Sequence, residues 1–470
     1  MKILNKEDIK DFYNQTAGSR EKWKKRNRFY HRSLEKYFSF IIPENIRVIE
    51  LGCGLGDLLN AVKPSYGGGI DYSGTMIEKA RNKYPDLTFH IADAEDFHSN
   101  ETFDYIILSD LAGCLWDIQK VFHNLRRLCH DQTRVVISNF NFLWEPVMNF
   151  GEFLHIKLPQ PKQNWLSTAD LSTLLELEGF QLVTVQKKLL FPKYVPVFNF
   201  FLNRIFANLS LLHNLDLVNL IVARPLLCNN VEHPVSIIIP ARNEFGNIEN
   251  IIKKIPFFGL SQEIIFVDGH SKDNSHHEML RVKNAYPEKN IKVMIQTGAG
   301  KGNAVREGFE AASGEVLMIL DADMTMPPED LGKFYIALKE NKGEFINGCR
   351  LVYPMQKEAM RFLNYLANKI FSVLFSFLLG QRLKDTLCGT KVLYKRDYER
   401  IKKSRQFFGD FDPFGDFDLI FGASKLNLKM IEIIVRYRDR EFGTTQIKRF
   451  KHGWLLTKMS MVAAKKIKFR

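Results

Sequence analysis

The sequence contains only six cysteines, and no two of them are spaced as a CxxC pair. They are Cys53, Cys114, Cys129, Cys228, Cys349 and Cys388. Without paired spacing, neither a structural zinc site nor a disulfide framework is expected. No apolar leader peptide is recognisable ahead of them. These absences predict a protein of the reducing cytoplasm.

The sequence also lacks a run of the roughly 18 to 20 apolar residues that a membrane-spanning helix needs. Segments 195–217 and 364–380 come close, but polar residues interrupt both of them. In the second segment, polar or small residues recur at every fourth position: Asn364, Asn368, Ser372, Ser376 and Gly380. This period places them on one stripe of a helix. We expect the first segment to be buried and the second to lie at a membrane interface.

The composition is that of a globular protein with a surplus of positive charge. Hydrophobic residues make up 45% of the 470 residues, charged residues make up 25%, and the formal net charge is +13. A chain of this length predicts two or three domains. A basic surface favours anionic partners. The sequence contains no nucleic-acid recognition module, so we expect no nucleic-acid partner and favour a membrane surface and nucleoside diphosphates.

Two strand–glycine loop–helix openings, near residues 48 and 235, indicate two α/β domains. Between them, segment 224–234 carries Pro225, Pro234 and an asparagine pair, which is typical of a linker. We therefore place the first domain at 1–227, the linker at 228–234, and the second domain at 235–470, which ends in a basic helix.

The first opening combines a glycine loop with acids at three strand ends. A short apolar strand, 48–51, leads into Gly52, Gly54 and Gly56, and a helix follows. Such glycines let the backbone approach a ligand at a helix N-terminus, although dinucleotide-binding proteins share the pattern. The strand-end acids are Glu50, Asp71 and Asp93. The carboxylate of Asp71, about 20 residues beyond the first strand, can accept both hydroxyls of a ribose.

This pattern resembles the class I S-adenosylmethionine-dependent methyltransferases over residues 10–224. The resemblance implies a Rossmann-like fold in which Gly52, Gly54 and Gly56 line the methionine part of the cofactor, with Glu50 as a further cofactor-binding residue. It also implies that Asp71 holds the ribose, that Asp93 lies near the adenine, and that Asp110 meets the substrate. The opening segment resembles the cofactor-covering cap of that family, with pocket candidates Tyr13, Tyr30 and His31. A nicotinamide-binding domain stays the alternative.

In the second half, four strand-like or loop segments carry polar residues in a fixed order. The candidates are Pro240, Glu244, Asp268, Lys301, Asp321 and Asp323. Two carboxylates that leave a strand two residues apart can hold Mg²⁺ or Mn²⁺ together with a diphosphate. That metal and the charge of Lys301 would stabilise a leaving nucleoside diphosphate.

This set resembles the family-two GT-A glycosyltransferases over residues 232–450, and within them the dolichol- and polyprenol-phosphate sugar synthases. The resemblance implies a GT-A nucleotide-sugar-binding fold in which Pro240, Glu244 and Asp268 bind the nucleoside. Asp321 and Asp323 would serve the sugar nucleotide and the metal, and Arg350 and Arg440 would contact phosphates. The chain departs from the family pattern at Ala241, Arg242 and His270, and it lacks the paired membrane helices of some members.

The acceptor decides whether a catalytic base is needed. A lipid phosphate is already anionic, whereas a sugar hydroxyl needs a carboxylate to take its proton. Asp416 falls where hydroxyl-directed relatives keep their base, and Asp418 falls where the lipid-phosphate synthases carry an acid. We expect a bifunctional enzyme whose inverting glycosyltransferase uses polyprenyl phosphate. A glycan or lipid hydroxyl acceptor, or one inactive domain that serves as a binding module, are the alternatives.

A basic run ends the sequence: Lys448, Arg449, Lys451, Lys458, Lys465, Lys466, Lys468 and Arg470. Apolar residues lie among these cations: Trp454, Leu455, Leu456, Met459 and Met461. A basic segment with apolar neighbours suits an anionic headgroup layer. We therefore expect peripheral attachment at the inner face of the membrane, without a spanning helix.

Overall fold

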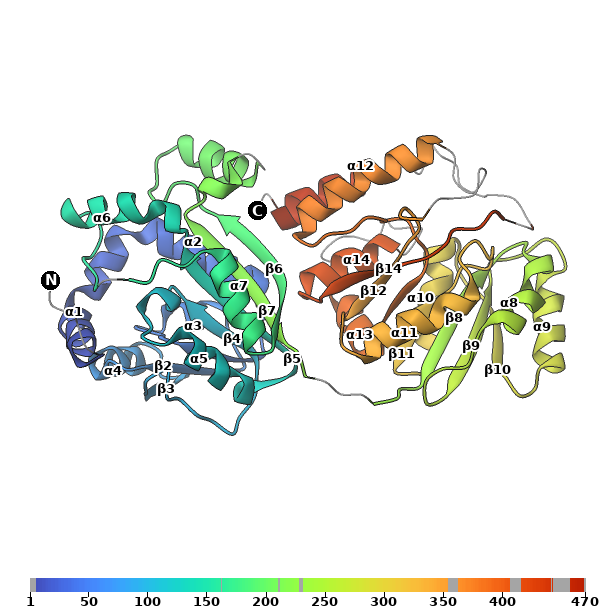
Figure 1. The fold of residues 1–470 in the computed structure, drawn as a ribbon, viewed down its shortest axis with the longest axis horizontal. Coiled ribbons are helices and arrows are strands. Elements are labelled where there is room, and N and C mark those ends of the chain that lie inside the picture. The colour runs from blue at the N-terminus through green and yellow to red at the C-terminus, as the bar shows by residue number, and fades with distance from the viewer. Residues whose placement is uncertain are drawn as a thin grey trace. The chain divides into compact units, whose positions relative to one another are not determined.

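The computed structural model describes residues 6–161, 163–209, 212–227, 231–353, 362–405, 416–440, 442 and 457–468. The chain forms two compact units, 1–227 and 228–468, and each is built around its own sheet (Figure 1). In the described part of the chain, no helix is long and apolar enough to cross a membrane.

The first unit has a seven-stranded sheet in the order β3-β2-β1-β4-β5-β7-β6. The strands are β1 (Arg47–Leu51), β2 (Tyr66–Asp71), β3 (Thr88–Ile91), β4 (Phe103–Ser109), β5 (Cys129–Phe140), β6 (Phe180–Lys188) and β7 (Val218–Pro225). The first five are parallel, and β7 runs antiparallel to both β5 and β6. Because β1 lies between β2 and β4, the residues that follow these three strands meet at one edge of the sheet.

Helices cover the faces of this sheet and bury the apolar residues of its strands in two core clusters. They are α1 (Lys6–Arg26), α2 (Arg28–Ile41), α3 (Asp57–Ala61), α4 (Gly74–Lys83), α5 (Ile118–Leu125), α6 (Glu145–Phe153) and α7 (Thr168–Leu177). Local signals start two of them. The Ser73 hydroxyl accepts from the Met76 N–H at 3.3 Å, and Ser167 and Asp170 form a reciprocal capping box on α7.

The expectation that segment 195–217 is buried is wrong for much of its length. Val197 is 72% exposed and Phe198 is 63% exposed, and further aromatic rings of the segment are exposed with them. Its asparagines turn inward instead. The Asn199 amide donates to the Lys193 carbonyl at 2.8 Å, and the Asn203 amide donates to the Phe191 carbonyl at 2.9 Å. The polar side chains thus form hydrogen bonds with backbone groups of the turn, and the apolar side chains face the solvent.

The second unit also has a seven-stranded sheet, in the order β10-β9-β8-β11-β13-β12-β14. The strands are β8 (Val235–Ala241), β9 (Gln262–Asp268), β10 (Asn290–Ile295), β11 (Val316–Ile319), β12 (Phe345–Cys349), β13 (Lys391–Tyr394) and β14 (Met430–Ile434). Only β13 is antiparallel to its neighbours. Because β8 lies between β9 and β11, the segments that follow these strands share one edge.

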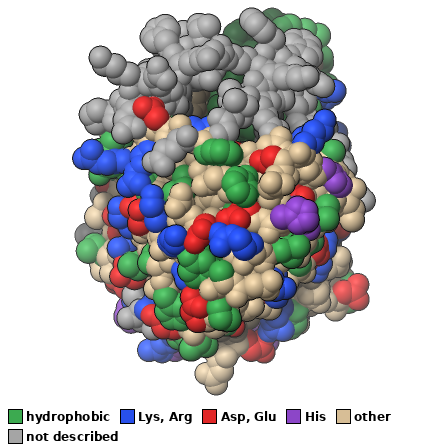
Figure 2. Space-filling view, turned by 90° about the vertical axis from the view of Figure 1, so that its right-hand side faces the viewer, with side chains coloured by type: hydrophobic (Ala, Val, Ile, Leu, Met, Phe, Trp, Pro, Cys, Tyr) green, Lys and Arg blue, Asp and Glu red, His purple; other side chains and the backbone are tan. Residues whose placement is uncertain are grey.

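The helices of the second unit pack against this sheet around two further apolar clusters. They are α8 (Ile248–Lys254), α9 (Ser275–Ala285), α10 (Lys301–Ala311), α11 (Leu331–Lys339), α12 (Phe362–Leu379), α13 (Lys395–Ser404) and α14 (Asp416–Lys425). Figure 2 shows hydrophobic, basic and acidic side chains interspersed on the face that it presents. The positive charge of the chain is therefore not gathered on that face.

Helix α12 buries its polar stripe and exposes apolar side chains. Asn368 and Ser372 are buried, whereas Ile370 is 60% exposed and Val373 is 72% exposed. The Ser372 hydroxyl donates to the Leu383 carbonyl at 2.6 Å, which gives the stripe a partner inside the unit. Phe375, Leu378 and Leu379 are buried in the core, so the apolar side chains of α12 are divided between the core and the surface, and only part of them could face a membrane.

Candidate functional site

The glycine loop between β1 and α3 has a backbone that favours glycine at three positions. Gly52, Gly54 and Gly56 have φ of 70°, 52° and 75°, in the left-handed region that other residues rarely adopt. A Cβ at Gly52 would lie 2.6 Å from a Leu111 methyl, and one at Gly56 would lie 2.6 Å from the Phe89 ring. A Cβ at Gly54 would meet nothing within 4 Å. The two ends of the loop therefore pack against other side chains, whereas its centre, at Gly54, is open.

Asp71, at the end of β2, holds this loop. The Gly54 N–H donates to Oδ2 at 2.9 Å, and the Ser73 N–H donates to Oδ1 at 2.9 Å. Burial raises the pKa of Asp71, and these two N–H donors oppose the rise. Glu50, at the end of β1, accepts from the Leu59 N–H at 3.1 Å, and burial raises its pKa to about 8. Asp71 thus touches the loop directly, whereas Glu50 supports α3 behind it.

Asp93 ties α1 to the segment that follows β3. The Lys6 ammonium lies 3.0 Å from Asp93 Oδ2 and 2.6 Å from Glu95 Oε2. The other oxygen of Asp93 accepts from the Glu95 N–H at 2.9 Å. Helix α1 is therefore held near the sheet edge where the strand-end acids meet. This position fits the expectation that the opening segment covers the cofactor.

Tyr30 and Asp110 form a pair that the sequence places 80 positions apart. The Tyr30 hydroxyl donates to Asp110 Oδ2 at 2.6 Å, and the Ser138 hydroxyl donates to Oδ1 at 2.8 Å. Asp110 has a φ of 53°, which turns the chain sharply after β4. Burial raises the pKa of both Asp110 and Tyr30. Burial also lowers the pKa of His31 to about 3, so its imidazole is neutral at pH 7.

A single cavity of about 550 Å³ brings the candidates of the first domain together. Its lining includes Glu50, Gly52, Gly54, Asp71, Asp93, Asp110, Tyr13, Tyr30 and His31. Gly56 is not part of that lining, and it packs against Phe89 instead. An open glycine beside a buried carboxylate suits the amino acid and ribose groups of a nucleoside cofactor. The residues present therefore fit S-adenosylmethionine.

Several residues of this cavity belong to no motif of the sequence. Arg20, Trp144, Phe150, Lys157 and Lys193 also line it. One signal was available, because Arg20 and Lys24 stand four positions apart and both line the cavity from α1. The others had no local signal, since they come from α6, from the segments directly before and after it, and from the turn after β6.

In the second unit, Asp321 follows β11 and pairs with a lysine from α10. Lys301 Nζ lies 2.6 Å from Asp321 Oδ1. Burial opposes ionisation of Asp321, but the lysine beside it holds the pKa of this carboxyl below its usual value. A Cβ at Gly389 would lie 2.0 Å from Asp321 Oδ2 and 2.4 Å from Lys301 Nζ. A larger residue at position 389 would have to displace this ion pair.

Asp323 pairs with an arginine from the segment after β14. Arg440 Nη2 lies 2.6 Å from Asp323 Oδ2, and its Nη1 lies 3.3 Å from Glu244 Oε1. The Thr325 hydroxyl donates to Asp323 Oδ1 at 2.7 Å. Burial raises the pKa of Glu244 to about 7, and the nearby arginine opposes that rise. One guanidinium thus joins two acids that follow different strands.

Asp268 and its neighbours lie at the same edge of the sheet. The Ser271 hydroxyl donates to Asp268 Oδ1 at 2.6 Å, and His276 Nδ1 lies 3.5 Å from Oδ2. Pro240 stands opposite Val267 in the β8–β9 register, just before this acid. His270 lies in the turn that follows β9, with a φ of 57°, and its Nε2 is 3.2 Å from the Gly298 carbonyl. Histidine here closes a turn against the glycine loop.

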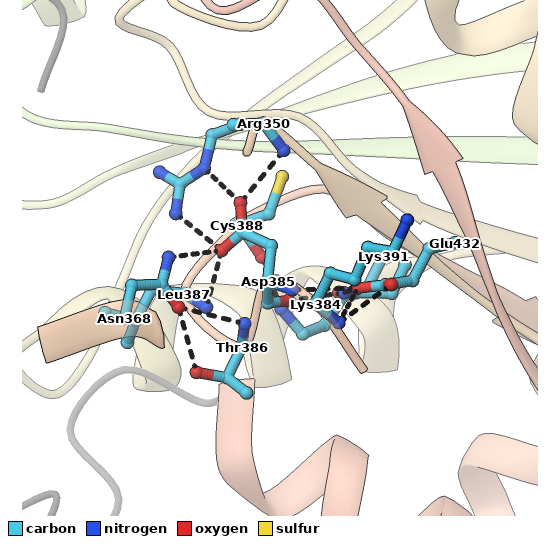
Figure 3. A network of polar contacts seen from close by, with 10 residues as sticks. Arg350, Asn368, Lys384, Asp385, Thr386, Leu387, Cys388, Lys391 and Glu432 are labelled. Atoms are coloured by element: carbon cyan, nitrogen blue, oxygen red, sulfur yellow. Dashed lines mark hydrogen bonds and ion pairs between the residues drawn. The ribbon is translucent and has the colours of Figure 1, made fainter. Parts of the chain in front are cut away.

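Arg350 is held by a polar network centred on Asp385 (Figure 3). Its Nε and Nη2 donate to the two oxygens of Asp385 at 2.7 and 2.8 Å, and Asn368 of α12 donates to the same carboxylate at 2.8 Å. Burial raises the pKa of Asp385, but the guanidinium outweighs this effect and holds it at about 2. The Glu432 carboxylate accepts from the Lys384 and Asp385 N–H groups. This network positions the loop that carries Gly389, while phosphate contact by Arg350 stays a prediction.

The base candidate Asp416 is the first residue of α14, and its side chain lies outside the described residues. Two positions later, Asp418 Oδ2 lies 3.1 Å from Arg405 Nε and 4.0 Å from Arg306 Nη1. Asp418 is therefore held between two arginines. The role of Asp416 as a catalytic base stays a prediction.

Among the described residues, no group of three or more His, Cys, Asp or Glu side chains could hold a metal ion. Asp321 and Asp323 supply hard oxygen donors, which suit Mg²⁺ or Mn²⁺. They fit an ion whose remaining ligands come from a diphosphate, and such an ion would replace the charges of Lys301 and Arg440 beside them.

Part of the basic C-terminal run lies outside the described residues, including Lys448, Arg449, Lys451 and the apolar group 454–456. In the described remainder, Met459 is buried in the core, against the expectation that it faces a membrane, while Met461 is exposed. Lys468 is also buried, with its Nζ 4.6 Å from the centroid of the Phe377 ring. Because Met459 and Lys468 are buried, neither of them can face a membrane as expected.

Two family models match this chain, one in each unit. A methyltransferase domain model matches residues 23–185, and a glycosyl transferase family 2 model matches residues 236–401. A dolichol-phosphate mannosyltransferase of Pyrococcus furiosus is 35% identical over 173 residues. That match covers 36% of this chain and 48% of the relative, so the chain spans about half the length of that protein.

Solved structures resemble each unit at low identity. A S-adenosylmethionine-dependent methyltransferase of Thermotoga maritima is 16% identical with a TM-score of 0.36, over 46% of this chain and 99% of that one. A glucosyl-3-phosphoglycerate synthase of Mycobacterium tuberculosis is 17% identical with a TM-score of 0.38, over 50% of this chain and 80% of that one.

The domain matches and the two sheets confirm the expected α/β fold class, a Rossmann-like methyltransferase fold followed by a GT-A fold. The chain therefore joins an N-terminal methyltransferase domain to a C-terminal family 2 glycosyltransferase domain.

Proposed function

We propose that the second domain is an inverting glycosyltransferase that moves a sugar from a nucleoside diphosphate to polyprenyl phosphate. The observation that carries this proposal is the pairing of Asp321 with Lys301 and of Asp323 with Arg440 at the exit of β11. Acids and cations alternate there, as a site for a diphosphate and a divalent ion requires. The relative named dolichol-phosphate mannosyltransferase supports the choice of acceptor.

The proposed chemistry is a single displacement. A phosphate oxygen of the lipid attacks the anomeric carbon, and the bond from that carbon to the nucleoside diphosphate breaks on the opposite side. The lipid phosphate is anionic near pH 7, so no side chain has to remove a proton. A divalent ion bound by Asp321 and Asp323 would supply charge to the departing diphosphate. Lys301 and Arg440 lie where they can hold the same oxygens.

We propose that the first domain transfers a methyl group from S-adenosylmethionine. The support is the open glycine loop with Asp71 in one cavity. The cofactor supplies an electrophilic methyl group, and the domain has to align the acceptor with it. Where the acceptor is a hydroxyl, the Tyr30–Asp110 pair offers a carboxylate to receive its proton. The two activities would then act on one glycan or glycolipid.

A donor screen tests the glycosyltransferase proposal. Purified protein is incubated with Mn²⁺, polyprenyl phosphate and each of several nucleoside-diphosphate sugars, and lipid-linked sugar is extracted and measured. We expect product with one donor. Transfer to a sugar hydroxyl, with no lipid-linked product from any donor, would replace the proposed acceptor.

We also propose peripheral attachment of the second domain to the inner face of the cytoplasmic membrane. The exposed Ile370 and Val373 of α12 and the exposed Met461 support it. Flotation with vesicles that contain anionic lipid should carry the protein upward, and added salt should weaken this effect. Equal recovery with neutral and anionic vesicles would count against the proposal.

A further inference from the structure

The cavity of the methyltransferase domain extends well beyond its glycine loop. Besides the cofactor residues, its lining includes Val147, Phe150 and Leu154 of α6 and its C-terminal end, and Phe191 of the turn after β6. Each of these four side chains is also exposed, and Phe150 is 60% exposed. The cavity therefore opens onto an apolar rim at the surface.

A row of contacts joins the polar end of the cavity to this rim. Tyr30, which holds Asp110, has its ring centroid 5.7 Å from that of Phe140. The Lys157 ammonium lies 5.8 Å from the centroid of the same Phe140 ring, and Trp144 and Met148 pack on the cluster that contains Tyr30. An acceptor at the Tyr30–Asp110 pair thus has an apolar path to the surface.

Further apolar side chains of this domain are exposed outside the cavity. The Phe153 ring on α6 is exposed, with its centroid 6.4 Å from that of Phe150, and Val197, Phe198 and Phe200 are exposed on the segment after the turn. Exposed apolar groups beside a cavity mark a contact site for another apolar body. The asparagine bonds within the turn keep these rings outward, so the exposure is built into the fold.

Two cations of the cavity make no ion pair in the part of the chain that the structure describes. Lys193 donates to the Asn27 side-chain oxygen at 2.6 Å, and burial and the nearby Arg26 lower its pKa. Arg20 lines the cavity and acts on Asp71 and Asp110 only through its field. Lys193 follows Phe191 and Pro192 in the cavity lining, next to the apolar rim. Its ammonium could therefore bind an anion where the polar and apolar parts of the cavity meet.

We propose that the methyl acceptor of this domain is a lipid-linked molecule with an anionic phosphate linkage. Its polar head reaches Tyr30 and Asp110, its phosphate lies at Lys193, and its chain covers the rim at Val147, Phe150 and Leu154. The assignment rests on the proposed methyltransferase function, and it names the substrate class of that site. A small water-soluble acceptor would leave the apolar side chains of the rim exposed to solvent.

Binding of isoprenoid probes to the full-length protein tests this assignment. The probes are geranylgeranyl phosphate, geranylgeraniol without the phosphate, and isopentenyl phosphate with only a short chain. Trp23, Trp116 and Trp144 line the cavity, so the part of the fluorescence change that Trp144→Phe removes reports this site and not the second domain. We expect geranylgeranyl phosphate to bind about tenfold more tightly than either of the other probes. The signal should decrease in Trp144→Phe.

Variants locate the chain and the phosphate separately. Phe150→Asp and Lys193→Gln should each weaken geranylgeranyl phosphate about tenfold. Leu177→Asp is the matched control, because Leu177 is a 65% exposed apolar residue on α7 that does not line the cavity. Calorimetry with S-adenosylhomocysteine should give the same affinity in all of these variants. If the wild type fails to bind S-adenosylhomocysteine, the methyltransferase function is wrong, while the lipid result is still read independently.

Three outcomes would overturn the assignment. The first is that isopentenyl phosphate binds as tightly as geranylgeranyl phosphate, and the second is that Leu177→Asp weakens binding as much as Phe150→Asp. The third is that the wild type sediments as a dimer which Phe150→Asp converts to a monomer. In that case a second copy of the chain, and not a lipid, covers the rim.

Discussion

The Arg440 guanidinium lies 2.6 Å from the Asp323 carboxylate, although 117 positions of the chain separate the two residues. The same guanidinium reaches Glu244 at 3.3 Å. Arg440 therefore connects an acid after β11 with an acid after β8, the two ends of the proposed donor site.

Replacing Arg440 by alanine should cost activity without a comparable loss of stability. Its loss removes a charge beside the departing diphosphate, and removal of one such donor costs about 100-fold in turnover. Arg438→Ala is the control, since Arg438 is exposed and its pair with Glu329 is long, at 3.8 Å. Steady-state rates of lipid-linked sugar formation measure both variants. Similar rates for the two would show that Arg440 has no special part in transfer.

Glycosyl transfer should require a divalent ion through Asp323. Asp323→Asn keeps the size of the side chain and removes one charge, so we expect loss of turnover and loss of the thermal stabilisation by Mn²⁺ with a nucleoside diphosphate. Asp330→Asn serves as the comparison, because Asp330 pairs with Lys333 at the start of α11. Full activity of the wild type in excess chelator would contradict this prediction.

Asp416→Asn separates the two possible acceptors. With a lipid phosphate as acceptor, the variant should keep substantial activity, because no proton has to be removed. With a hydroxyl acceptor, loss of the base should cost roughly 100- to 10,000-fold. Product formation is measured together with donor binding by calorimetry. If the variant binds donor normally and transfers nothing, polyprenyl phosphate is the wrong acceptor.

Asp71→Ala should weaken S-adenosylmethionine binding to the full-length chain. The change removes the proposed ribose acceptor and the anchor of the Gly54 N–H, which together are worth about 2 kcal/mol, or roughly 30-fold in Kd. Asp86→Ala, at an exposed turn before β3, should bind normally. Calorimetry measures both variants, and tight binding of a nicotinamide dinucleotide in place of S-adenosylmethionine would refute the cofactor assignment.

The stability of the chain should fall with rising pH because of Glu50. Burial raises its pKa from 4.5 to about 8, so between these values the folded state retains a proton that the unfolded state has released. The contribution is complete below pH 4.5 and is lost as the pH rises toward 8. Between pH 5 and pH 8.5, the Tm of the transition in which the first domain unfolds should therefore drop less in Glu50→Gln than in the wild type. An unchanged drop would show that Glu50 does not carry this effect.

Several features of the two sites could be predicted from sequence because they depend on local pattern. Apolar runs that end in glycine or an acid predict buried parallel strands with polar exits, and parallel strands bring those exits to one edge. Asp71 and Asp268 end strands in this way, and Asp93, Asp321 and Asp323 follow them. The distance along the chain does not matter for these residues, since the sheet itself brings them together.

Only the tertiary structure decided which side chains pair and which way an amphipathic segment faces. The partners of Tyr30, Arg350 and Arg440 lie 80, 35 and 117 positions away, and no local signal connects them. Segment 195–217 carries both apolar rings and asparagines, and its composition fits burial or exposure equally well. Its asparagines bond the backbone of the turn, so the rings face outward. The apolar content of such a segment is written in the sequence, but its direction depends on where its polar side chains find partners.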